Sequence, residues 1–138
     1  MNEFRFKVSL RFFSQVVDPN EICEKLKMEP EWKHKIGDPR TTPKGITLDG
    51  FYDTSYCSFL ITPRKNEELH DVIERIVTDL QKHESLFCRI REDGGCIEFF
   101  VGWFSTGNSG ETFSSDLLRK LGKLQIDLSL DVYGDKKK

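Results

Sequence analysis

The chain lacks several features that would assign a protein to a class by themselves. It has no surplus of positive charge, because 21 Lys and Arg face 23 Asp and Glu, for a net charge of −2 over 138 residues. Strong non-specific nucleic-acid binding needs such a surplus, so we do not expect it. No apolar run is long enough for a membrane helix, and no apolar segment follows basic residues at the start. We therefore expect a soluble, cytoplasmic protein that does not enter a membrane.

Cysteine is scarce and poorly placed for metal binding. No two cysteines form a C-x-x-C pair, and none lies at zinc-ligand spacing from a histidine. We expect no metal site and no cofactor, and we interpret the cysteines as free thiols that pack as small apolar side chains. The residues concerned are Cys23, Cys57, Cys88, Cys96, His34, His70 and His83.

Nucleotide-binding fingerprints are also missing. The glycine-rich stretch 102–110 contains neither G-x-G-x-x-G nor a Gly-Lys-Ser/Thr ending. Backbone N–H groups in such a stretch can hold a phosphate. We favour the simpler interpretation, a turn that precedes a helix capped by Ser114 or Ser115.

Phenylalanine, in contrast, is abundant, with 11 residues against 3 Tyr and 2 Trp. Hydrophobic residues make up 37% of the chain, and the 10 glycines raise the apolar share to about 44%, as in globular proteins. The length fits one domain, which we place at residues 1–134, followed by a disordered basic tail at 135–138. So many large rings must enter a core or lie on a binding face.

Hydrophobic periodicity predicts an α+β domain. Alternation of apolar and polar residues indicates strands, and apolar residues three and four apart indicate helices. The strands are predicted at 4–12, 51–62 and 126–132, with a hairpin at 86–104 that turns at Asp93-Gly94 or at Gly94-Gly95. The helices are predicted after Asp18, from a cap at Asn66 to near His83, and at 115–121. From residue 51 onward this is the ferredoxin-like β-α-β-β-α-β order, preceded by an extra β-α unit.

The strand pattern also predicts how the layers are arranged. Each strand has one apolar face, so we expect a two-layer fold: a mostly antiparallel sheet with helices on one face only. The first strand turns Arg5, Lys7 and Arg11 outward, and the last strand turns Asp127 and Asp131 outward. Because opposite charges across a sheet stabilise pairing, we expect these two strands to be neighbours.

The uncovered face of the sheet is one candidate binding surface. By strand parity it carries aromatic rings and arginines, which are enriched at protein interfaces. Single-stranded RNA platforms use similar residues, but the stretch 98–103 does not fit the RNA-recognition consensus. The interpretation is a surface for a protein partner, or a face that is covered by the long loop at 29–50 or by a second copy of the chain. The residues are Phe13, Phe87, Phe100, Tyr133, Arg11, Arg89 and Arg91.

The long Gly- and Pro-containing loop at residues 29–50 is a second candidate. Trp32 and the basic side chains of this loop could hold a small anionic ligand or an acidic partner. We favour the alternative in which Trp32 packs at the edge of the core and the charges are solvated. His34 and Asp38, with Arg40 nearby, could also serve acid–base chemistry, but a loop does not fix them on one face.

Short motifs at both ends of the chain resemble a known family. Asp18-Pro19-Asn20-Glu21-Ile22, Leu26-x-x-x-Pro30, Gly37-Asp38 and Leu128-x-Leu130-x-x-Tyr133 resemble bacterial proteins grouped as domain of unknown function 4279. That family usually has a Trp where this chain has Phe51-Tyr52. The resemblance implies a small bacterial-type α+β domain and supplies no catalytic residues.

These observations favour a non-enzymatic module that binds a protein or a ligand through the open sheet face and the loop 29–50. The alternative is a small enzyme or anion-binding protein that uses His34, Asp38 and Arg40.

Overall fold

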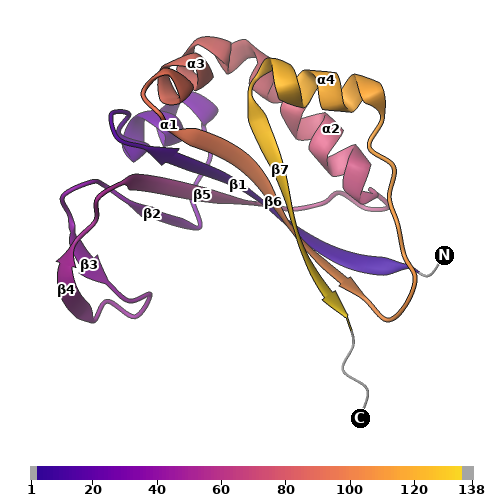
Figure 1. Cartoon of the computed structure of the whole chain (residues 1–138), viewed down its shortest axis with the longest axis horizontal. Coiled ribbons are helices and arrows are strands. Elements are labelled where there is room, and N and C mark those ends of the chain that lie inside the picture. Colours follow the sequence, from indigo (N-terminus) through magenta and orange to yellow (C-terminus); the bar gives the residue numbers. More distant parts are fainter. Residues whose placement is uncertain (1–2, 135–138) are drawn as a thin grey trace.

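A five-stranded sheet forms one layer of the protein, and helices that all lie on one side of it form the other (Figure 1). The computed structural model describes residues 3–134, so the tail predicted at 135–138 lies outside the described residues. The elements are β1 (Phe4–Ser14), α1 (Pro19–Leu26), β2 (Trp32–His34), β3 (Pro39–Thr41), β4 (Thr47–Phe51), β5 (Ser55–Ile61), α2 (Leu69–Leu80), the short 3-10 helix η1 (Gln81–His83), α3 (Glu84–Glu92), β6 (Cys96–Ser105), α4 (Ser115–Lys123) and β7 (Ile126–Gly134).

The sheet runs in the order β2-β5-β1-β6-β7, and β3 and β4 form a separate hairpin. All neighbours in the five-stranded sheet are antiparallel except β6 and β7, which are parallel. The predicted pairing of the first and last strands is wrong, because β6 lies between them. Its Glu98 stands opposite Arg11 of β1 and lies 3.2 Å from the Arg11 Nε, so an acid on β6 meets the basic face of β1.

The predicted hairpin at 86–104 is also wrong in its first half, which is helix α3. Leu86, Phe87 and Ile90 fall on one helical face and are buried. Gly94 has φ +81° just beyond the end of α3, where a left-handed residue commonly follows a helix rather than turning a hairpin. The ferredoxin-like order depended on this hairpin and is not confirmed.

Strand parity places the core correctly. Phe12, Phe59 and Phe99 are fully buried under the helices, and Phe4 and Phe6 are partly buried against the same core. Helix α2 contributes six buried residues at helical spacing: Leu69, Val72, Ile73, Ile76, Val77 and Leu80. The opposite face of the sheet therefore keeps its side chains available to solvent.

Local signals at the helix starts agree with these elements. The Asp18 carboxylate accepts from the Asn20 N–H at the start of α1, and the Ser114 hydroxyl accepts from the Leu117 N–H at the start of α4, as the sequence predicts. Among residues 3–134 no helix is both long enough and apolar enough to span a membrane.

Candidate functional site

Five rings surround one hollow at the β2 end of the open sheet face, and we call it the aromatic pocket. Its rings belong to Phe13, Trp32, His34, Tyr52 and Tyr56, and its volume is about 440 Å³. All five side chains are only partly buried. The remaining lining residues are Asp53 and Thr54, which lie at its rim.

Strand pairing brings these rings together from distant parts of the sequence. Residues 32–34 of the long loop add to the sheet as the edge strand β2, with Trp32 opposite Ser58 and His34 opposite Tyr56. Residues two apart on a strand share a face, so Trp32 and His34 both lie on the face that carries Tyr56. On the other side of β5, Tyr56 stands opposite Phe13 of β1. The loop and the sheet face, two separate candidates in the sequence, thus form one site.

The rings make a continuous wall. The His34 imidazole stacks on the Tyr52 ring with centroids 3.5 Å apart and planes 7° apart. Its other neighbour is Tyr56, at 5.5 Å between centroids, and Tyr56 in turn lies 5.0 Å from the Phe13 ring. A flat group that enters the pocket therefore meets ring faces and edges, and Asp53 is the one ionisable carboxylate among the lining residues.

The environment of His34 keeps its imidazole neutral. Burial lowers the pKa of His34 below its usual value, and a backbone hydrogen bond with Thr54 and the nearby Asp38 carboxylate raise it by less. Its Nδ1 atom is buried and has no hydrogen-bond partner among the described residues. At neutral pH this ring therefore acts as an uncharged stacking surface.

Arg11 borders the pocket and shows how its rings accommodate a flat cation. The guanidinium carbon lies 4.5 Å from the Phe100 centroid, 5.5 Å from that of Phe13 and 5.8 Å from that of Tyr56. Glu98 pairs with the same guanidinium and balances its charge. The open face thus already holds one planar cation against three rings.

Not every residue predicted for the open face lies there. Phe13, Phe100, Arg11 and Tyr133 do, and Tyr133 stacks on Phe104 with centroids 5.1 Å apart, beyond the aromatic pocket.

The placement of Phe87, Arg89 and Arg91 on the open face is wrong, because it depended on the hairpin. Phe87 is 1% exposed and packs against Phe12 in the core. Arg89 extends from α3 to an ion pair with Glu21 on α1. Arg91 lies in the last turn of the same helix.

The three loop residues considered for catalysis have separate partners. The Asp38 carboxylate accepts from the backbone N–H of Lys35, and Arg40 donates to the Asp49 carbonyl within the β3–β4 hairpin. Within residues 3–134, no hydrogen bond or ion pair joins His34 to either of them. The structure therefore brings His34 to the aromatic pocket and leaves Asp38 and Arg40 in the hairpin region.

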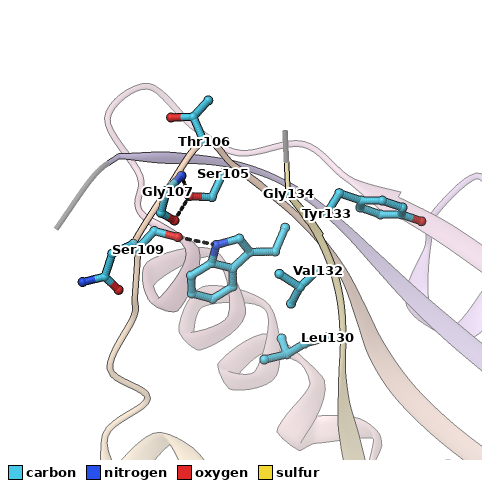
Figure 2. A pocket seen from close by; sticks show the side chains of 10 residues that line it. Ser105, Thr106, Gly107, Ser109, Leu130, Val132, Tyr133 and Gly134 are labelled. Carbon is cyan, nitrogen blue, oxygen red and sulfur yellow. Dashed lines mark hydrogen bonds between the residues drawn. The ribbon is translucent and has the colours of Figure 1, made fainter. Parts of the chain in front are cut away.

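A second hollow of about 540 Å³ lies where β6 and β7 extend past the helices (Figure 2), and we call it the Trp103 pocket. Its lining carries no charged side chain. Trp103 donates from its indole N–H to the Ser109 hydroxyl at 2.9 Å, and the Ser105 hydroxyl donates to the Gly107 carbonyl at 2.8 Å. These bonds order the glycine-rich loop, which the sequence analysis interprets as a simple turn before a helix.

One cluster has residue types that can ligate a metal. The candidate ligand atoms of Glu68, His70 and Asp71 lie within 4.8 Å of one another at the start of α2, and the two carboxylates are largely exposed. The Glu111 carboxylate lies 3.0 Å from the His70 Nδ1 and, as a hydrogen-bond partner, raises the pKa of His70. This contact and the capping box of Glu68 and Asp71 account for the cluster without an ion. No known spacing motif marks it in the sequence.

Comparison with known proteins identifies the family. The family model described as Domain of unknown function (DUF4279) matches residues 2–135, which is nearly the whole chain, so the chain belongs to that family. Searches of curated proteins and of solved structures found no match. The family description assigns no activity, and residue roles therefore rest on the geometry above.

Proposed function

We propose that this member of the DUF4279 family is a binding module without chemistry of its own, and that it holds a planar group of its partner in the aromatic pocket. One observation carries the proposal: the fold brings five partly exposed rings from distant segments around one hollow. A ring that only served folding would be buried with Phe12 and Phe99. Rings left at a shared surface hollow are typical of recognition sites.

The ring geometry favours a flat group. The stack of His34 on Tyr52 already shows face-to-face packing at 3.5 Å in this pocket. Since the lowered pKa of His34 keeps its imidazole neutral, it does not repel a planar cation either. Aromatic pairs contribute about 0.5–1.5 kcal/mol beyond the area they bury. An aromatic ring or a guanidinium is therefore the group that fits best.

The surroundings of the pocket favour a protein as the partner. Arg11 and Glu98 form an ion pair beside the rings. Farther along the same face lie Arg5 and Lys7 on β1 and Asp131 on β7, so the open face carries charges of both signs. Aromatic residues and arginine at the centre with a charged rim are the composition of protein interfaces. We infer that a side chain of a protein partner supplies the planar group.

A matched pair of side-chain analogues tests this function. We expect N-acetyl-tyrosinamide to bind and its ring-saturated counterpart, N-acetyl-(4-hydroxycyclohexyl)alaninamide, to bind much more weakly, because the two differ only in the π face. Calorimetry or NMR titration measures both affinities. Trp32→Ala is expected to weaken binding of the aromatic analogue up to about tenfold, the upper range for loss of an aromatic contact.

The matched control is Leu60→Ala. Leu60 is an exposed residue of β5 on the same face, outside the aromatic pocket. Its replacement should leave both affinities unchanged. Equal binding of the two analogues, or an equal loss in the two variants, would contradict the proposed function.

A further inference from the structure

The outer side of β7 is an open sheet edge. This strand has nine residues and lies last in the sheet order, with β6 on its inner side. No strand pairs with its outer side among residues 3–134. Half of the backbone N–H and C=O groups of an edge strand face outward and can pair with another chain.

On the helix side of this edge, apolar side chains are exposed beside the Trp103 pocket. Leu130 is 47% exposed and Val132 is 64% exposed, although both belong to the face that the helices cover elsewhere. Figure 2 shows both side chains directed into the hollow, with Ser109 on its opposite wall, whereas Tyr133 points away. A strand added along β7 would place every second side chain next to this uncharged hollow.

On the open side of the same edge, the side chains are acidic. Asp127 and Asp131 alternate with Ser129 along β7 and lie on the open face. The nearest cation to Asp127 is Arg91, whose Nη1 lies 3.8 Å away in a largely solvent-exposed contact that contributes little. Asp131 accepts a hydrogen bond from Tyr133, and Lys7 lines the same small hollow as Asp131. The Asp127 side chain is 60% exposed and Asp131 is partly exposed, so a partner can reach both carboxylates along the edge.

We propose that an extended segment of a partner protein, with alternating apolar and basic side chains, adds to β7 as a sixth strand. Its apolar side chains enter the Trp103 pocket beside Leu130 and Val132. Its basic side chains pair with Asp127 and Asp131 on the other face. Backbone hydrogen bonds along the edge supply the affinity, and the two faces supply the specificity. This site is separate from the aromatic pocket, so the inference does not depend on the proposed function.

Charge argues against a second copy of the chain as the occupant. Two β7 strands that paired antiparallel in one continuous sheet would bring the acidic row of each copy onto the same face. Asp127 and Asp131 of one copy would then lie close to those of the other, and like charges across a sheet destabilise pairing. A basic–apolar segment replaces this repulsion with attraction.

The probe is a blocked heptapeptide of alternating lysine and valine, labelled for fluorescence anisotropy. A peptide of the same composition in two blocks, lysines first and valines after, carries the same charge without the alternation. We expect the alternating peptide to bind at least tenfold more tightly. An alternating peptide with N-methyl groups along one edge should lose binding, because it cannot donate to β7.

Charge reversal in the protein provides the second arm. The double variant Asp127→Lys and Asp131→Lys is expected to weaken binding of the alternating peptide about tenfold, because two exposed attractions become repulsions. The matched control reverses Glu24 and Glu29 to Lys, two exposed acids near the α1 end of the molecule. It should bind the peptide as the unaltered protein does.

Three outcomes would overturn the inference. They are equal binding of the alternating and block peptides, binding that survives N-methylation of the peptide, and an equal loss of binding in the two charge-reversed proteins.

Sedimentation of the protein alone provides a further check. A dimer that Val132→Asp dissociates would assign the edge to a second copy instead. Because the peptide arms use the unaltered protein, the inference remains testable even if a variant does not fold.

Discussion

The two edges of the main sheet differ in length and in what they present. At one edge, β2 has three residues and is followed by the β3–β4 hairpin, and its contribution is two rings that complete the aromatic pocket. At the other edge, β7 has nine residues and presents an open backbone flanked by apolar and acidic side chains. One sheet thus offers recognition by side chains at one edge and by backbone at the other.

The difference also shows how each edge avoids unwanted pairing. A very short edge strand gives another chain little to pair with, and β2 needs no further protection. The longer β7 is protected mainly by Asp127 and Asp131, which disfavour an acidic or purely apolar strand. Protection by charge is selective, because a basic strand is still accepted.

The largest predicted effect comes from a change in the hydrophobic core, on which both edges of the sheet depend. Phe99 of β6 is fully buried between the sheet and the helices. Phe99→Ala should lower the free energy of unfolding by about 3–5 kcal/mol, as for other large core residues. Urea denaturation measures this loss, and binding at both edges should weaken together. If binding weakened at only one edge, the two edges would not depend on one core.

A smaller change should affect one edge more than the other. A Cβ added at Gly95 would lie 2.4 Å from the Phe13 carbonyl oxygen and 2.7 Å from that of Ile90, so the backbone must move. Gly95→Ala is expected to cost about 1–3 kcal/mol, the range for overpacking. Because Phe13 lines the aromatic pocket, binding of the aromatic analogue should weaken while peptide binding at β7 persists.

The control for this prediction is Gly122→Ala. A Cβ at Gly122 meets no atom within 4 Å, and the residue lies inside α4, where alanine is favoured. This variant should not lower stability. Weakened binding of the aromatic analogue in Gly122→Ala would show that the effect of Gly95→Ala is not local.

The smallest predicted effects are two pH dependences of opposite sign. Burial lowers the pKa of His34 in the folded state, so its contribution to stability is present above the unfolded value near 6.5 and declines as the pH falls. The Glu111 contact raises the pKa of His70, so its contribution is present below that value and is lost as the pH rises through the folded pKa.

Urea midpoints between pH 5 and 8 measure both dependences. His34→Gln should reduce the loss of stability on the acid side, whereas His70→Gln should lower stability most on the acid side. Binding of the aromatic analogue should respond to pH only through His34, since that ring lines the aromatic pocket and His70 does not. The same pH slope in both variants would contradict these assignments.

The sequence predicts the central strands and the apolar face of α2 well, because their patterns are local and regular, although Glu68 rather than Asn66 caps this helix. Alternation along β1 places Phe13 on the open face and Phe12 in the core, and both lie there. The same rule fails at residues 86–92, since Leu86, Phe87 and Ile90 also fit one face of a helix. Only packing under the sheet decides between the two structures.

The aromatic pocket could be predicted only in parts. Trp32, His34 and Phe13 are each candidates in the sequence, but three residues of edge strand within a long loop give no periodic signal. Tyr52 and Tyr56 join them only through the register of β2 on β5. The parallel pairing of β7 with β6 is likewise set by tertiary packing, and the edge of β7 is open because this strand lies last in the sheet.

The chain's two tryptophans allow one direct test of the central claim, because Trp32 lines the aromatic pocket and Trp103 lines the pocket beside β7. Each indole N–H gives its own signal in a nitrogen–proton NMR spectrum, and Trp32→Phe assigns them. Titration with N-acetyl-tyrosinamide should shift the Trp32 signal and leave the Trp103 signal in place. A titration that leaves the Trp32 signal unchanged would contradict the account of the aromatic pocket as the binding site.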